Sequence, residues 1–191
     1  MREYLIIENT VVGKSLAVVP DTAPYDVAAL NEPMAVALHC VNRAEARTTD
    51  KVVVFGAGPI GLGATIRLKL RGVAHVAVAV VPERPQEGVA VGADAVIDSS
   101  HEDVTARLTE LHGQGANALG QPRPDTDIYI DGAGAPAVVN TALASAKWGA
   151  RLVMVAVQKK SEIDLSAMLH SEMTLIAFQG YPRATPQRSS R

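Results

Sequence analysis

From Lys51 onward, short apolar runs alternate with segments whose apolar positions recur at helical spacing. The apolar runs lie at residues 52–55, 76–81, 95–97, 128–130, 152–157 and 175–178. The helical segments lie at about residues 59–71, 102–112, 135–147 and 165–170. Strands that are apolar throughout, without an alternating polar face, are typical of parallel sheets covered by helices on both sides. The pattern therefore predicts an α/β fold with a doubly wound, six-stranded parallel sheet in the strand order 3-2-1-4-5-6.

The chain before Lys51 follows a different pattern. Residues 4–7 and 16–19 are apolar and predict a short N-terminal β attachment. Residues 24–46 predict helix with a break at Asn31-Glu32-Pro33. Proline is tolerated in a first helical turn, so a second helix is expected to start there.

Three further local predictions concern the rest of the chain. Ser99 or Ser100 is the candidate N-cap for the helix over 102–112. Residues 113–126 contain three glycines and two prolines and predict a loop. Residues 183–191 have no apolar periodicity and predict a disordered tail.

Composition and charge exclude several classes of function. The net charge is −2, and positive and negative residues are interspersed. The sequence therefore lacks the basic stripe of a nucleic-acid-binding protein. The single cysteine, Cys40, cannot form an internal disulfide and is typical of a reducing compartment. The chain does not begin with a signal-peptide pattern, and its apolar runs fall short of the roughly 18 residues of a membrane span. We therefore expect a cytoplasmic protein that binds neither nucleic acid nor membrane.

The motif that carries chemistry is Gly56-Ala57-Gly58-Pro59-Ile60-Gly61. It follows one predicted strand directly and opens a predicted helix, which is the context that a dinucleotide-binding (Rossmann) turn requires. Gly56 permits the tight turn, Gly58 lets the backbone approach a pyrophosphate, and Gly61 lets the helix pack close to the strand. Pro59 has no amide proton, so Ile60 and Gly61 are the expected donors to the anion. The alternative is that the glycines only make a tight connection.

The next expected contact is with the adenosine ribose. NAD sites of this type carry Asp or Glu at the end of the second strand, about 20 residues beyond the glycine turn. That position falls near Ala79, which is followed by Val80 and Val81, so the acid is missing. Arg84 follows shortly afterwards and can meet the 2′-phosphate of NADP. The alternative for Arg84 is a solvated surface arginine. The predicted cofactor is therefore NAD or NADP, with a lean to NADP.

Four stretches together resemble the medium-chain, zinc-dependent alcohol dehydrogenases. They are Ala28–His39, Asp50–Gly61, Gly92–Asp98 and Asp131–Gly134, and the likeness runs from about Tyr4 to Pro182. The branch of sorbitol, threonine and butanediol dehydrogenases is the most similar. Family members transfer hydride between an alcohol carbon and a nicotinamide, and a catalytic zinc polarises the alcohol oxygen. The resemblance implies that the full enzyme binds a dinucleotide and a small alcohol or polyol.

The resemblance also implies residue roles, none of them catalytic. It places the pyrophosphate at Gly58–Gly61, the adenosine ribose near Ala79 and Arg84, and the nicotinamide beside Ala133, Gly134, Ala156 and Val157. Glu32 matches a carboxylate that lies at the zinc in the polyol branch. Alone it cannot make a zinc site, which needs three or four ligands. We favour the reading of Glu32 as an acidic residue at a helix start, and we expect that this chain does not hold zinc by itself.

The resemblance divides the chain into three parts. Residues 1–22 are expected to be a remnant of the catalytic domain, residues 23–182 the NAD(P)-binding domain, and residues 183–191 the tail. Most of the catalytic domain is absent, so we expect a truncated, excised or split enzyme that binds dinucleotide but turns over alcohols poorly or not at all. The alternative is a non-catalytic dinucleotide-binding or oligomerisation module. Family members pair through the outer edge of this domain, which implies a homodimer through residues 175–178.

Overall fold

The structure, a computed structural model, describes residues 6–80, 85–157 and 162–180. The chain falls into two compact units, residues 1–32 and residues 33–191. The predicted division at residues 22 and 182 is a division by function, and it stays a prediction.

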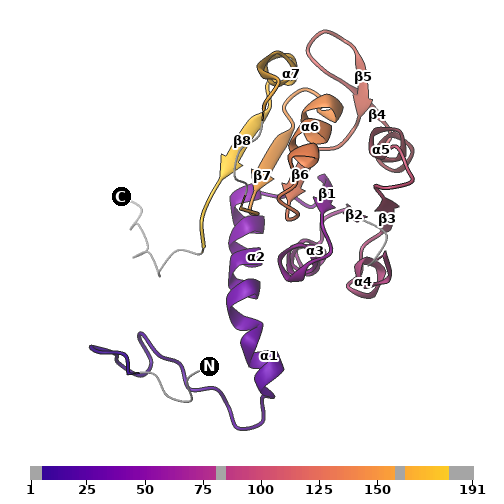
Figure 1. Cartoon of the computed structure of the whole chain (residues 1–191). Coiled ribbons are helices and arrows are strands. Elements are labelled where there is room, and N and C mark those ends of the chain that lie inside the picture. Colours follow the sequence, from indigo (N-terminus) through magenta and orange to yellow (C-terminus); the bar gives the residue numbers. More distant parts are fainter. Residues whose placement is uncertain (1–5, 81–84, 158–161, 181–191) are drawn as a thin grey trace. The chain divides into compact units, whose positions relative to one another are not determined.

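Among the described residues of the second unit, six strands form one parallel sheet in the order β3-β2-β1-β6-β7-β8 (Figure 1). The strands are β1 (Lys51–Phe55), β2 (His75–Val80), β3 (Ala95–Asp98), β6 (Ile128–Asp131), β7 (Arg151–Met154) and β8 (Thr174–Ala177). The predicted fold class and strand order are therefore confirmed. The chain builds outward from β1 to β3 and then returns to β6. Such a reversal is the point at which ligands bind in open α/β sheets.

Helices cover both faces of this sheet. One face packs against α2 (Asn31–Ala44), α3 (Pro59–Leu70) and α4 (Pro85–Ala90), and the other against α5 (Val104–His112), α6 (Pro136–Ser145) and α7 (Leu165–Ser171). Successive residues of β1 alternate between the two cores, with Val52 and Val54 in one and Val53 and Phe55 in the other. Because both faces are buried, every position from Val52 to Phe55 is apolar. Of the helices that the structure describes, none is long and apolar enough to cross a membrane.

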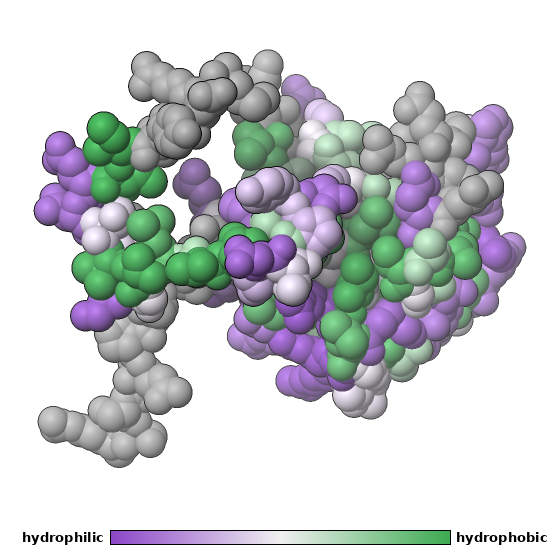
Figure 2. All heavy atoms as spheres, turned by 90° about the horizontal axis from the view of Figure 1, so that it is seen from below, coloured by the Kyte–Doolittle hydropathy of each residue, from purple (hydrophilic) through white to green (hydrophobic). Residues whose placement is uncertain are grey.

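The first unit lacks the predicted β attachment at its described positions. Residues 6–22 contain one isolated bridge, between Val12 and Leu16, instead of the predicted pairing of residues 4–7 with residues 16–19. Residues 4–5 lie outside the described part. A two-stranded pair is marginal without a third strand or a packed face, and here Ile6 is 92% and Val18 77% exposed. Exposed apolar side chains are visible as green surface in Figure 2. The helix α1 (Tyr25–Ala29) ends before Asn31, so the predicted helix break is confirmed.

Residues 113–126 contain a hairpin where the sequence predicted a loop. The strand β4 (Gln114–Ala116) pairs antiparallel with β5 (Pro122–Pro124). Neighbouring backbone holds it in place, because Trp148 N donates to Ala116 O (2.9 Å) and Ala118 N donates to His170 O (2.8 Å). These partners are remote in sequence, so local composition did not predict the hairpin.

One prediction at a helix start is also wrong, and one helix was missed. The N-cap of α5 is Asp103, whose carboxylate accepts from Thr105 N (2.8 Å) and Ala106 N (3.1 Å), instead of Ser99 or Ser100. The helix α4 was not predicted, because its sequence combines an initial proline with Gly88 and lacks a clear apolar stripe.

Candidate functional site

Three glycines meet where β1 ends and α3 begins. Gly56 has φ of +100°, a left-handed conformation that favours glycine. A Cβ on Gly61 would overlap the carbonyl oxygen of Gly56, so a larger residue does not fit. A Cβ on Gly132, just after β6, would lie 3.1 Å from the carbonyl oxygen of Phe55. We call these three residues the glycine crossing. It sets the start of α3 tightly against the ends of the two central strands.

The start of α3 is made of uncovered backbone. Its N-cap is Gly58, and no described side chain caps it or places an acid in its first turn. Pro59 occupies the first helical position, and the amides of Ile60 and Gly61 have no acceptor within a helix of this geometry. A Cβ on Gly58 would meet no described heavy atom within 4 Å. The helix dipole and these amides therefore suit an anion that approaches from the side of Gly58.

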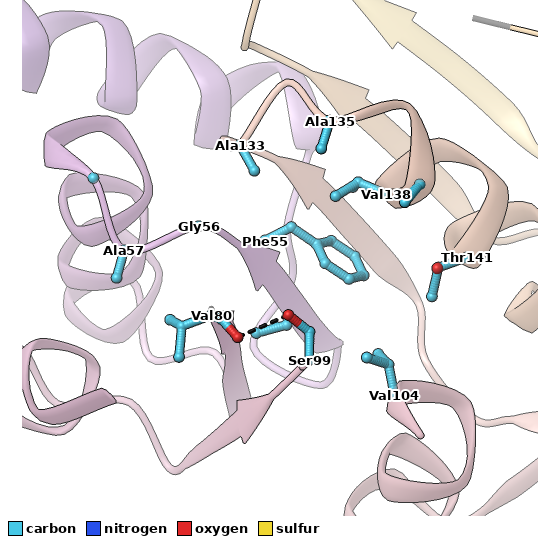
Figure 3. A pocket seen from close by; sticks show the side chains of 13 residues that line it. Phe55, Gly56, Ala57, Val80, Ser99, Val104, Ala133, Ala135, Val138 and Thr141 are labelled. Atoms are coloured by element: carbon cyan, nitrogen blue, oxygen red, sulfur yellow. Dashed lines mark hydrogen bonds between the residues drawn. The ribbon is translucent and has the colours of Figure 1, made fainter. Parts of the chain in front are cut away.

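A cavity of about 490 Å³ opens beside the glycine crossing (Figure 3). Its walls come from the carboxyl ends of β1 and β2, the glycine turn, the residue after β3, the loop after β6, the start of α5 and the first half of α6. The lining residues are Phe55, Gly56, Ala57, Gly58, Ala79, Val80, Ser99, Val104, Ala133, Ala135, Ala137, Val138 and Thr141. Among these described residues, none is charged and only Ser99 and Thr141 carry a polar side chain. An apolar cavity with a few polar groups is typical of a cofactor site.

The end of β2 forms one wall of the cavity. Ala79 and Val80 are each 3% exposed, and the strand continues to Val80, one residue beyond the predicted ribose position. The hydroxyl of Ser99 donates to the carbonyl oxygen of Val80 (2.7 Å), as Figure 3 shows. Arg84 lies outside the described residues, so its proposed contact with a 2′-phosphate stays a prediction.

The loops after β6 and β7 lie side by side. Asp131 is buried, and its carboxylate accepts from Ala133 N (3.1 Å) and Gly134 N (2.8 Å), which fixes the first loop. A Cβ on Gly134 would lie 3.1 Å from the Cβ of Ala156. Ala133 lines the cavity, whereas the side chain of Val157 is 95% exposed. The structure thus brings together the residues predicted to line a nicotinamide, and that role stays a prediction.

Glu32 is exposed and lies at the end of the first unit. In the described part of the chain, no three His, Cys, Asp or Glu side chains are grouped so that they could hold a metal ion. The described residues therefore do not fit a zinc site, and the predicted contact of Glu32 with zinc stays a prediction.

Sequence reasoning missed several residues of the cavity wall. The larger or polar ones among them are Phe55, Ser99, Val104, Val138 and Thr141. Phe55 and Ser99 sit at or directly after strand ends, where ligands bind in parallel sheets, and this signal could have found them. The other three belong to helices, and only the packing of α5 and α6 turns them toward the cavity.

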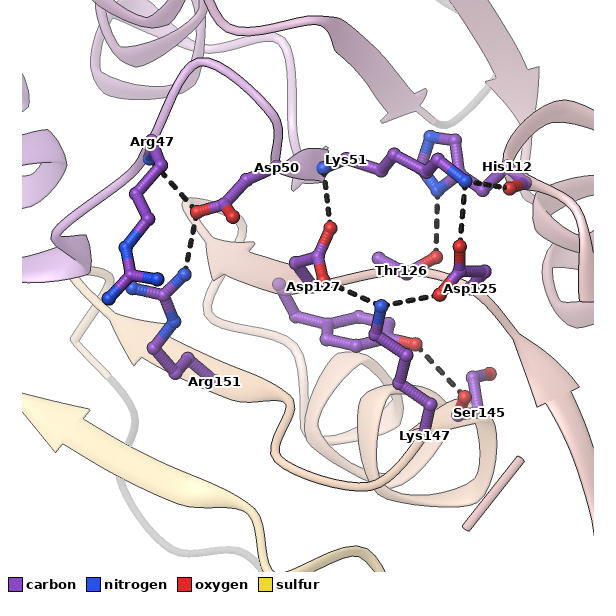
Figure 4. A network of polar contacts seen from close by, with 11 residues as sticks. Arg47, Asp50, Lys51, His112, Asp125, Thr126, Asp127, Ser145, Lys147 and Arg151 are labelled. Carbon is purple, nitrogen blue, oxygen red and sulfur yellow. Dashed lines mark hydrogen bonds and ion pairs between the residues drawn. The ribbon is translucent and has the colours of Figure 1, made fainter. Parts of the chain in front are cut away.

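A polar cluster lies at the opposite end of the strands, where they begin (Figure 4). Asp125 pairs with Lys51 (2.7 Å) and Lys147 (2.5 Å), and Lys147 also pairs with Asp127 (2.6 Å). Asp127 accepts in turn from Lys51 N (2.8 Å). Burial raises the pKa of Asp125, but the hydrogen bonds from Lys147 and Lys51 outweigh it and hold the pKa below its usual value. The cluster joins the start of β1 to the segment before β6 and to the end of α6.

Two histidines extend the polar cluster toward β2. His112 is 3% exposed, with Nε2 3.0 Å from His75 Nδ1 and Nδ1 2.8 Å from Thr126 Oγ1. Burial, together with His75 and Lys51, lowers the pKa of His112 to about 4. The ring is therefore neutral at pH 7, and both of its nitrogens have partners. None of these described residues lines the cavity, and we assign the polar cluster to stability.

The chain is similar to several known dehydrogenases. The (R,R)-butanediol dehydrogenase of Bacillus subtilis (strain 168) is 33% identical over 181 residues, which are 94% of this chain and 48% of that relative. The sorbitol dehydrogenase of Homo sapiens is 30% identical over 162 residues, which are 84% of this chain and 43% of that relative. The crystal structure of 2R,3R-butanediol dehydrogenase from Bacillus subtilis matches with a TM-score of 0.71 and 32% identity over 85% of this chain and 45% of that one.

The chain spans just under half the length of the curated relatives it matches. The sequence profile of the zinc-binding dehydrogenases matches residues 59–189, which is more than half of the chain. The resemblance noted from the sequence is thereby confirmed, and this chain belongs to the zinc-binding dehydrogenase family.

Proposed function

We propose that this chain binds a nicotinamide dinucleotide, NAD or NADP, across the carboxyl ends of its parallel strands. The observation that carries the proposal is the glycine crossing beside an apolar cavity of about 490 Å³. The crossing leaves backbone amides at the start of α3 for a pyrophosphate, and the cavity has the size and walls that suit an adenosine. Their junction lies at the strand reversal, where such ligands bind.

The proposed contacts follow the dinucleotide from one end to the other. Gly56, Gly58, Pro59, Ile60 and Gly61 surround the pyrophosphate, with Ile60 and Gly61 as amide donors. Ala79 and Arg84 lie at the adenosine ribose, and Ala133, Gly134, Ala156 and Val157 lie beside the nicotinamide. Closeness of the loops after β6 and β7 supports the last assignment. The lean to NADP rests on Arg84 alone.

In the full enzyme, we propose, the bound nicotinamide exchanges a hydride with a carbon of a small alcohol or polyol. The relatives named as butanediol and sorbitol dehydrogenases support this substrate class. Because the described residues do not fit a zinc site, we propose that this polypeptide alone binds dinucleotide but oxidises alcohols poorly or not at all. Zinc-dependent dehydrogenase activity from the isolated polypeptide would contradict this second statement.

We also propose a cytoplasmic homodimer that joins through β8. This strand is at the edge of the sheet, and its Leu175 is 37% exposed. An edge strand with exposed apolar side chains is a template for pairing. Light scattering over a range of concentrations tests the proposal, since a monomer at every concentration contradicts it.

The substitution Gly58→Ala tests the dinucleotide site directly. A Cβ at this position meets no described heavy atom within 4 Å, so the fold should be unaffected. The same methyl group would stand where the pyrophosphate must approach the backbone. We expect the affinity for NADH, measured by fluorescence titration, to fall by at least about tenfold, or about 1.4 kcal/mol.

The matched control is Gly115→Ala in β4. Its Cβ would make an ordinary contact of 3.4 Å with Asp125 Cα, far along the chain from the glycine turn. This variant should bind NADH like the unmodified protein. The proposal fails if the unmodified chain binds neither NADH nor NADPH, or if Gly58→Ala binds as tightly as the control while both remain folded by circular dichroism.

A further inference from the structure

A second cavity lies between the hairpin of β4 and β5 and the helices α6 and α7, and its volume is about 180 Å³. The hairpin reaches α7 because Ala118 N donates to His170 O (2.8 Å). The helices α6 and α7 pack on the same core, and Figure 1 shows them beside the hairpin. Among the described residues, none lines both this cavity and the cavity beside the glycine crossing. The second cavity is therefore a separate site.

The size of the second cavity limits what it can hold. Its volume corresponds to about six water-sized groups, at about 30 Å³ for each water molecule in the liquid. This is well below the roughly 300–1,000 Å³ of sites for larger ligands, so a nucleotide does not fit. Leu143 and Ala146 are buried and make part of the wall apolar. The cavity thus suits a small molecule with a short hydrocarbon part.

Arg123 brings a positive charge to this cavity. It belongs to β5 and is half-buried, and its guanidinium donates to Pro122 O (2.7 Å) and to Gln121 Oε1 (3.1 Å). The remaining N–H groups of the guanidinium have no acceptor among the described residues. Arginine presents its N–H donors in a planar fork that matches a carboxylate. Arg123 therefore keeps capacity for an anionic group inside the cavity.

Asp164 brings the opposite charge to the same cavity. Its Oδ1 accepts from Ser166 N (2.9 Å) and Ala167 N (3.1 Å), while Oδ2 has no donor in the described part of the chain. Asp164 and Arg123 form no ion pair, so their charged atoms lie more than about 4 Å apart. Two opposite charges thus line one small cavity without reaching each other.

Two uncharged or titratable polar groups of α7 also line the cavity, the hydroxyl of Ser166 and the imidazole of His170. Neither side chain hydrogen-bonds to another residue that the structure describes. A hydroxyl can donate and accept, and so can the two nitrogens of an imidazole. A few polar groups that converge on a partly apolar cavity are typical of a small-molecule site.

We propose that this second cavity binds a small zwitterion of the α-amino acid class. Its carboxylate meets the guanidinium of Arg123, and its ammonium group meets the carboxylate of Asp164. An α-amino acid carries both charged groups on one carbon atom, so a single molecule can join two side chains that do not reach each other. Leu143 and Ala146 leave an apolar surface for a short side chain such as that of alanine.

Titration of the full chain with L-alanine, propionate and ethylamine, followed by NMR of the backbone amides, tests the proposal. Propionate is alanine without the ammonium group, and ethylamine is alanine without the carboxylate. We expect L-alanine to bind with a dissociation constant of about 1 mM or tighter and to shift amides of the hairpin and α7. Propionate and ethylamine each lack one charge-assisted contact and should bind at least about tenfold more weakly.

Two substitutions separate the contributions of the charges. Asp164→Asn removes the negative charge and keeps the N-cap of α7, because Asn caps a helix about as well as Asp. It should weaken L-alanine at least about tenfold and leave the affinity for propionate unchanged. Arg123→Gln removes the positive charge and should weaken both L-alanine and propionate.

Asp103→Asn is the matched control for Asp164→Asn. Asp103 caps α5 in the same way, through bonds from Thr105 N (2.8 Å) and Ala106 N (3.1 Å), and it does not line the second cavity. Arg43→Gln, on the exposed side of α2, is the control for Arg123→Gln. Both controls should bind L-alanine like the unmodified chain. Thermal melts followed by circular dichroism show whether each variant is folded.

Three results would overturn the proposal. One is that L-alanine at about 10 mM, ten times the expected dissociation constant, leaves the amides of the hairpin and α7 unshifted. Another is that propionate binds as tightly as L-alanine, since the ammonium group then contributes nothing. The third is that Asp164→Asn binds L-alanine as tightly as Asp103→Asn. NADH titration of the same samples reports on the dinucleotide site alone, so a failure of either site is recognised separately.

Discussion

Acidification from pH 7 to pH 4 should destabilise the second unit through His112. The folded chain holds the pKa of this ring at about 4, whereas the ordinary value is 6.5. Below pH 6.5 the unfolded chain therefore binds a proton that the folded chain excludes. Stability from this group is complete above pH 6.5 and is lost as the pH falls toward 4.

The magnitude follows from the two pKa values of His112. A difference of one in pKa corresponds to about 1.4 kcal/mol, so the fall from 6.5 to about 4 amounts to about 3 kcal/mol. The ring is only 3% exposed, so solvent screening reduces this figure little. Burial is the largest cause; His75 and Lys51 add to it, while Asp127 and Asp125 oppose it. A loss of this size is a large part of the about 5–15 kcal/mol that stabilises a domain.

Urea denaturation followed by circular dichroism at several pH values between 7 and 4.5 measures the effect. The pH dependence should become clearly weaker in His112→Gln and persist in His170→Gln, a matched control outside the polar cluster. Burial also lowers the pKa of His75 and of His39, so these two groups account for the remainder. Carboxylates with lowered pKa, such as Asp94 and Asp125, lose their stabilising contribution only as the pH falls below about 3.8, so they do not interfere. A free energy of unfolding that is constant from pH 6.5 to 4.5, or that declines equally in His112→Gln, would refute the reasoning.

Two further substitutions test the packing around the site. Gly61→Ala forces a Cβ into the carbonyl oxygen of Gly56, and it should lower the free energy of unfolding by about 3 kcal/mol or more; a urea midpoint like that of the unmodified chain contradicts the glycine crossing. Tyr129→Phe removes the hydroxyl that donates to Ser145 O (3.0 Å) and leaves a buried acceptor without that donor, so stability should fall by about 1–3 kcal/mol in the same assay. A change below about 0.5 kcal/mol would mean that the carbonyl finds another donor.

The parallel sheet was predictable because both of its faces are buried. Val52 to Phe55 must be apolar at every position when successive side chains enter two cores, and this leaves an unbroken run in the sequence. The glycine turn was equally predictable from the sequence, since position 61 has no room for a side chain beside Gly56 and must be glycine. Backbone contacts of this kind involve residues that are close in the sequence, so a short sequence motif is enough to predict them.

The missed features depend on contacts between distant residues. The hairpin of β4 and β5 is held by the backbone of Trp148 and His170, which no composition of residues 113–126 encodes. The sequence predicted Ser99 as a helix cap. Its actual bond reaches Val80 at the end of the neighbouring strand, and local sequence does not reveal a contact between residues so far apart in the chain. The β attachment failed for the converse reason, since apolar residues such as Val18 lack a described partner surface to pack against.

The glycine crossing has a consequence for how binding data respond to acid. The proposed phosphate donors, the amides of Ile60 and Gly61, belong to the backbone and do not titrate between pH 4 and 7, so that contact has no acid sensitivity of its own. The proton-sensitive group His112 lies at the far end of the strands, where it governs the fraction of chains that are folded. A decline in dinucleotide binding on mild acidification would thus reflect a smaller fraction of folded chains. In each folded chain the contact between these amides and the phosphates would be unchanged.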